Sequence, residues 1–97
     1  MAVGHTLQDL MPSISRTLRA AAVQMESQPG DKPANFAKME RLLVESAQQG
    51  AELVVFPECC VTGYWFLRHL SLDRLAELAE PIPSGPSTER LCELAAR

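Results

Sequence analysis

The feature that most constrains the fold is a short, uninterrupted apolar run, LVVF, at residues 53–56. A run of strand-forming residues without polar alternation predicts a strand covered on both faces, as in parallel sheets. Residues 18–25, LRAAAVQM, are also short and largely apolar, and a turn signal follows them at Pro29 and Gly30. This segment predicts an earlier strand of the same sheet.

The segment between these two strands has the pattern of an amphipathic helix. Asp31 is placed to cap its start, Pro33 is tolerated in its first turn, and Gly50 stands where helices often close. Its apolar positions recur at steps of three and four: Phe36, Met39, Leu43 and Ala47. Parallel strands need a crossover of a dozen or more residues, and this helix supplies it. The chain is therefore predicted to contain a right-handed β-α-β unit.

Two more helices are expected beyond this unit. The first is capped by Ser71 and stopped by Pro81, and the second begins near Ser87. The predicted class is thus α/β, with residues 1–16 as an irregular tail and residues 17–97 as a folded domain. A short packed helix within the tail stays an alternative, because its apolar residues have roughly helical spacing.

Composition excludes several classes of function. The chain has 97 residues and a formal net charge of −3, so it has no excess of basic residues to attract nucleic acid or acidic lipid. It has no apolar stretch near the ~20 residues that cross a bilayer, and residues 1–15 lack the pattern of a secretory signal. Three cysteines, two of them adjacent, suit a reducing compartment better than disulfides. We therefore expect a cytoplasmic protein without a metal site or other cofactor.

The residue that points most directly to chemistry is Glu58. It follows the carboxyl end of the expected buried strand, which is where open α/β sheets place their ligand sites. Pro57 cannot donate a ladder hydrogen bond, so it ends regular pairing just before the carboxylate. A carboxylate beside LVVF would be costly to bury, which is typical of tuned acid-base groups. The alternative is a solvated acid in a surface loop.

A wider motif surrounds this glutamate: V-V-F-P-E is followed by T-G-Y at residues 62–64. The motif resembles the glutamate motif of the nitrilase superfamily of carbon-nitrogen hydrolases. Asn35 at the helix start and the Pro-Ser-Gly-Pro-Ser segment at residues 83–87 match the family in order and spacing, so the resemblance covers residues 18–97. It implies a partial α-β-β-α sandwich, of which this chain is the incomplete amino-terminal part.

The resemblance also implies a catalytic glutamate, lysine and cysteine, of which only the glutamate, Glu58, is matched. Lys32 and Lys38 precede the motif instead of following it. Cys92 lies in a helical pattern, which favours a small core residue over a nucleophile. Cys59 and Cys60 are expected to pack behind the glutamate.

Tyr64 is the second candidate site residue, since the resemblance would place it at the border of a substrate pocket. Packing is the alternative role for this aromatic side chain.

Two functions follow as alternatives. The first is hydrolysis of a non-peptide carbon-nitrogen bond in a small amide or carbamoyl compound, with a nitrile less favoured, by a homo-oligomer when the protein is complete. The second is a non-catalytic truncated fragment or interaction module, which would be inactive alone because the lysine and the cysteine are missing.

Overall fold

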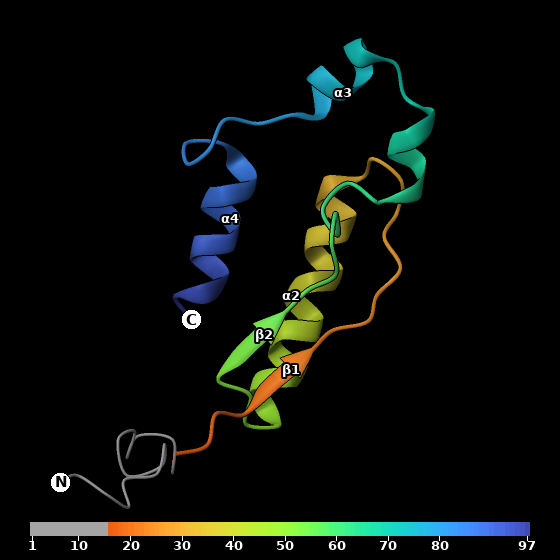
Figure 1. Ribbon diagram of the computed structural model, residues 1–97. Coiled ribbons are helices and arrows are strands. Elements are labelled where there is room, and N and C mark those ends of the chain that lie inside the picture. The colour runs from red at the N-terminus through yellow and green to blue at the C-terminus, as the bar shows by residue number, and fades with distance from the viewer. Residues whose placement is uncertain (1–15) are drawn as a thin grey trace, which may run out of the picture.

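The structure of the chain is a computed structural model that describes residues 16–97. The expected tail therefore lies, apart from its last residue, outside the described residues. The elements follow one another as β1 (Ala20–Ala22), α2 (Lys32–Gln48), β2 (Leu53–Val55), the 3-10 helix η2 (Trp65–His69), α3 (Leu72–Leu78) and α4 (Pro86–Ala95) (Figure 1). The α/β class is confirmed, whereas the domain boundary near residue 16 stays a prediction.

The predicted β-α-β unit is present. β1 and β2 pair in parallel, with Ala20 opposite Leu53 and Ala22 opposite Val55. Both strands are only three residues long. The pairing ends with a hydrogen bond of 2.8 Å from the Val23 amide to the Val55 carbonyl. Pro57, two residues later, has no amide hydrogen to continue the ladder. The first strand is therefore shorter than the expected residues 18–25.

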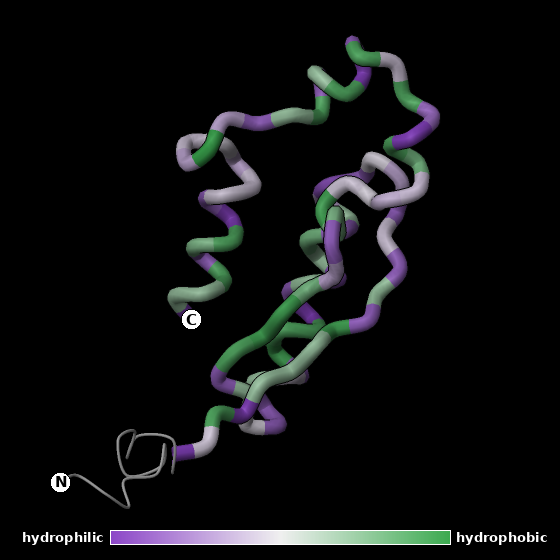
Figure 2. The backbone as a smooth tube through the Cα atoms, in the orientation of Figure 1, coloured by the Kyte–Doolittle hydropathy of each residue, from purple (hydrophilic) through white to green (hydrophobic). Residues whose placement is uncertain are grey.

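Helix α2 lies against one face of this small sheet and leaves the other face open among the described residues (Figure 1). Side chains alternate along β2, so Val54 is half-buried while Leu53 and Val55 are 48% and 54% exposed. The prediction that both faces of this strand are covered is thus wrong for residues 16–97. Figure 2 shows that both strands are apolar.

The caps predicted for α2 are confirmed. The Asp31 Oδ1 atom accepts a 3.1 Å hydrogen bond from the Ala34 amide, and Gly50 has a φ of +90° just beyond the helix end. The helix buries Phe36 and Met39, but Ala47, the last residue of the expected apolar stripe, is exposed. The buried part of the helix is therefore its amino-terminal half.

The core is small and joins α2 to α4. Phe36, Met39 and Leu94 are its buried members, with partly buried apolar residues around them. At the rim, the Glu40 carboxylate binds the Arg90 guanidinium at 2.5 Å and also contacts Arg97. Both apolar contact and ion pairs therefore hold α4 on α2.

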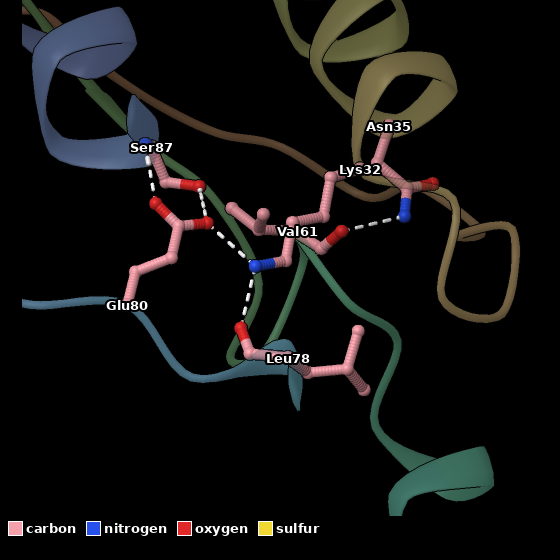
Figure 3. A network of polar contacts seen from close by, with 6 residues as sticks. All are labelled: Lys32, Asn35, Val61, Leu78, Glu80 and Ser87. Atoms are coloured by element: carbon pink, nitrogen blue, oxygen red, sulfur yellow. Dashed lines mark hydrogen bonds and ion pairs between the residues drawn. The ribbon is translucent and has the colours of Figure 1, made fainter. Parts of the chain in front are cut away.

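The segment between α3 and α4 is tied back to the start of α2 by a polar network (Figure 3). The Lys32 Nζ atom lies 2.5 Å from Glu80 Oε2 and donates to the Leu78 carbonyl. Glu80 in turn accepts bonds of 2.6 Å from the amide and the hydroxyl of Ser87, at the start of α4. These bonds hold the pKa of Glu80 far below its ordinary value, at about 2, with Lys32 as the largest cause.

Helix α3 is held less firmly. Ser71 caps it as predicted, with its Oγ atom accepting a 3.3 Å bond from the Arg74 amide. Leu72, the first residue of this helix, is nevertheless 84% exposed. Within residues 16–97, no helix has both the length and the apolar character to cross a membrane.

Candidate active site

Glu58 stands where the chain leaves the sheet. β2 ends at Val55, and the backbone turns at once, with the Cys60 amide donating to the Pro57 carbonyl at 3.2 Å. A second bond of 2.8 Å runs from the Gly63 amide to the Cys59 carbonyl. Cys59 has a φ of +55°, an uncommon conformation for a non-glycine residue that completes this tight turn. The turn presents Glu58 at the carboxyl end of the strand.

The environment of the Glu58 side chain differs from the sequence expectation. Residue 58 is exposed in the described chain, so its charge is not enclosed by the apolar strand. Phe56 and Pro57, which precede it, are half-buried. A carboxylate in this position keeps its hydration, and it can accept a proton from a group that enters the space in front of it.

That space is a surface hollow of about 650 Å³. Its walls come from the two loops that follow β1 and β2, and η2 closes one side. Glu58 and Tyr64, the two candidate site residues, both line it, together with Met25, Glu26, Ser27, Gln28, Pro29, Pro57, Gly63, Trp65, Phe66 and His69. The structure thus brings both candidates to one hollow, while their roles in a reaction stay predictions.

The side of the hollow formed by Tyr64 and η2 is aromatic. Tyr64 and Trp65 meet edge to face with ring centroids 5.5 Å apart, and both are more than half exposed. The Arg68 guanidinium lies 4.9 Å from the centre of the Trp65 ring, and its Nε atom donates to His69 Nε2 at 3.1 Å. An apolar surface beside a carboxylate suits a small ligand with an apolar part and a polar reacting group.

Glu26, a second carboxylate on the hollow, was missed by the sequence reasoning. Its signal was weak, because an acid one residue beyond a short apolar segment is common at protein surfaces.

The cysteines are arranged differently from the expectation. Cys60 packs inward, with its Sγ atom 3.7 Å from Met39 Sδ, and burial raises its pKa above the ordinary thiol value. Cys59 is exposed, so the prediction that both adjacent cysteines pack behind the glutamate holds for Cys60 alone. Cys92 is also exposed, because α4 turns Leu94 toward the core, and its predicted core role is wrong in this structure.

Neither lysine of the chain lines the hollow, although Lys38 bonds to a residue that does. Lys32 is held by Glu80 and the Leu78 carbonyl, and Lys38 donates to the backbone carbonyl of Glu26. Among the described residues, the lining of the hollow includes neither a lysine nor a cysteine. Residues 16–97 also bring together no group of three potential metal ligands, and the absence of a metal site stays a prediction.

Comparison with known proteins identifies the lineage. The family model described as carbon-nitrogen hydrolase matches residues 19–97, which is most of the chain. The chain belongs to the carbon-nitrogen hydrolase family. This assignment confirms the resemblance drawn from the residues around Glu58, and it makes carbon-nitrogen bond hydrolysis the general chemistry of the lineage.

Several curated relatives of this member of the carbon-nitrogen hydrolase family are nitrilases. It is 38% identical to a nitrilase of Pyrococcus abyssi over 80% of its own length and 29% of the relative's. It is 35% identical to nitrilase 3 of Arabidopsis thaliana over 98% of the chain and 31% of the relative. A bifunctional nitrilase/nitrile hydratase of Nicotiana tabacum is 50% identical over 54% of the chain and 15% of the relative. The chain therefore spans less than a third of the length of these relatives.

Proposed function

We propose that the complete protein hydrolyses a non-peptide carbon-nitrogen bond in a small amide or carbamoyl compound, with Glu58 as the general base. Family membership supports the reaction class. The observation that carries the role of Glu58 is its position: it stands on a tight turn at the carboxyl end of β2 and lines an open hollow.

In this proposal the nucleophile is a cysteine thiol. Glu58 accepts the thiol proton while sulfur attacks the carbonyl carbon, and it then passes that proton to the departing amine. A lysine ammonium stabilises the oxyanion of the tetrahedral intermediate. Water, deprotonated by Glu58, cleaves the resulting thioester, releases the acid and regenerates the thiol. Atoms and charge balance without any cofactor.

The lysine and the cysteine of this proposal come from outside residues 16–97. Lys32 is bonded to Glu80, Lys38 is bonded to the Glu26 carbonyl and does not line the hollow, and Cys60 faces Met39. The proposed site is therefore assembled when further chain covers the hollow. This requirement agrees with the short span of the chain relative to its relatives. Because Tyr64 lines the hollow, it would form a wall of the substrate pocket in the complete protein.

A nitrile is the second candidate substrate. The specific observation in its favour is that the relatives described above carry the names nitrilase and nitrilase/nitrile hydratase. The same groups would serve, because a thiol adds to a nitrile carbon as it adds to a carbonyl carbon, and two waters then yield the acid and ammonia. Both substrate classes use Glu58 in the same way.

The chain on its own is proposed to be inactive and prone to association. Leu53 and Val55 expose an apolar sheet face, and each of two short strands leaves an edge with unpaired backbone groups among the described residues. Another part of the protein, or a second copy in a homo-oligomer, would cover these surfaces. The three unpaired thiols support a reducing, cytoplasmic location for the protein.

The test of this function is a substrate panel. The complete protein and the 97-residue chain are each incubated with matched small amides, carbamoyl compounds and nitriles, and ammonia and acid are measured. Turnover of amides or carbamoyl compounds by the complete protein alone is the expected result. Turnover of nitriles only would favour the second candidate, and turnover by the isolated chain would overturn the proposed assembly of the site.

A further inference from the structure

Asn35, in the first turn of α2, is a polar side chain that is fully buried. Burial of an amide is unfavourable unless each of its polar atoms finds a partner. The three bonds of Asn35 meet this condition. The Oδ1 atom accepts from the Gln28 amide at 2.7 Å, and the Nδ2 atom donates to the carbonyls of Gln28 and Val61 at 2.9 and 2.8 Å. Figure 3 shows the bond to Val61.

These partners belong to two different loops. Gln28 lies in the loop after β1, and Val61 lies in the turn after β2, three residues beyond Glu58. Both loops line the hollow in which Glu58 stands. Asn35 therefore links the two walls of the hollow to each other and to the rigid start of a 17-residue helix.

Two other bonds join the same loops. The Ser27 hydroxyl donates to the Cys60 carbonyl, and the Gly30 amide donates to the Thr62 carbonyl, each at 2.8 Å. Neither bond reaches α2. Asn35 is the group among these contacts that fixes both loops to a helix, and it does so from a site without solvent access.

The geometry requires an amide at this position. An aspartate would place an acceptor oxygen where Nδ2 donates to the carbonyls of Gln28 and Val61, so both of these contacts would become repulsive. A leucine of similar size would leave the Gln28 amide hydrogen and the Val61 carbonyl without these partners, and the Gln28 carbonyl would keep only its 3.2 Å bond from the Asp31 amide. Asparagine alone combines two donors and an acceptor at this side-chain length.

We infer that Asn35 is a positioning residue for the reaction: it acts through the turn that carries Glu58 and does not touch substrate. The inference rests on the proposed role of Glu58. Loss of this link would let Glu58 shift relative to the opposite wall, and a displacement of about 1 Å in a catalytic group can lower a rate by roughly 10²-fold. Asn35 bonds no residue of η2, so substrate contacts with the η2 side of the hollow are expected to change less.

The experiment compares two variants of the complete protein, Asn35→Asp and Phe36→Leu. Phe36 is the neighbouring buried residue of α2, and it lines the space between α2 and α4 instead of the hollow. Asn35→Asp is expected to lower kcat by about 10²-fold with KM within about threefold. Phe36→Leu is expected to lower the melting temperature and to keep kcat within about threefold. Equal kcat losses in the two variants, or none in Asn35→Asp, would overturn the inference.

A second readout separates this inference from the proposed function. Hydrogen exchange is measured in the same proteins at two amides: that of Gly30, which joins the two loops, and that of Gly63, which closes the turn after β2. Asn35→Asp is expected to speed their exchange about tenfold more than Phe36→Leu does. If the parent hydrolyses no substrate, the hydrolase proposal fails, and the exchange data alone decide whether Asn35 positions the loops. Should Asn35→Asp not fold, Asn35→Ser takes its place with the same expected outcomes.

Discussion

Lys32 and Glu80 are 48 residues apart in sequence, yet the ammonium and the carboxylate lie 2.5 Å from each other. Their contact connects the first turn of α2 to the segment between α3 and α4. Because Glu80 also binds Ser87 at the start of α4, one carboxylate fixes three parts of the chain. The open arrangement of the helices thus depends on a polar junction as well as on the small core.

The first prediction concerns acid stability. The folded state lowers the pKa of Glu80 from 4.5 to about 2, with Lys32 and then Ser87 as the causes. A depressed carboxyl pKa adds stability above the unfolded pKa, and this contribution is lost as pH falls from about 4.5 toward 2. Glu80→Gln should therefore lower the melting temperature at pH 6 and reduce the further loss between pH 4.5 and 2.

The control for this prediction is Glu77→Gln. Glu77 forms an ion pair with Arg74 at 3.1 Å, but both side chains are more than 60% exposed, so water screens the pair. This variant should follow the parent across the whole pH range. If Glu80→Gln also follows the parent, the junction with Lys32 contributes nothing to acid stability.

The second prediction concerns Gly85, which precedes α4. It is buried, and a Cβ atom built on it would lie 2.5 Å from the Pro81 carbonyl oxygen and 2.9 Å from Glu80 Cβ. The obstacle is backbone, so the segment before α4 must shift. Gly85→Ala is expected to lower the free energy of unfolding by about 1–3 kcal/mol, measured by urea denaturation. Ser84→Ala, at the exposed neighbour, should change it by less than about 0.5 kcal/mol.

The third prediction concerns thiol reactivity. Cys59 and Cys92 are exposed, whereas Cys60 is partly buried against Met39 and has a raised pKa, first because of burial. The thiolate is the reactive form, so Cys60 should react more slowly than the other two. Titration of the native chain with a disulfide reagent near pH 8 should show two fast thiols and one slow thiol. Three equal rates would contradict the inward packing of Cys60.

Local sequence signals predicted the elements well. Asp31 and Ser71 cap their helices because capping depends on a side chain and an amide three residues away. The β-α-β order followed from the apolar runs and the periodicity between them. Glu58 could be placed at the end of β2 from the sequence because it directly follows Pro57 and the apolar run of that strand.

Long-range relationships could not be predicted in this way. The exposure of Leu53 and Val55 depends on what lies over the sheet, and a buried strand and an uncovered strand share one local pattern. Asn35 was recognised only as a residue in the family pattern, since its partners Gln28 and Val61 are set by the fold of two loops. The junction of Lys32 with Glu80 left no local signal for the same reason.

The role proposed for Glu58 is that of the general base in the complete carbon-nitrogen hydrolase. Its most direct test is the steady-state rate of the complete protein with its best substrate, compared with the Glu58→Gln variant, which keeps the size of the side chain but cannot accept a proton. Glu52→Gln, at the opposite end of β2, is the matched control. We expect a loss of about 10²-fold or more for Glu58→Gln and a near-normal rate for Glu52→Gln. A near-normal rate in folded Glu58→Gln would contradict it.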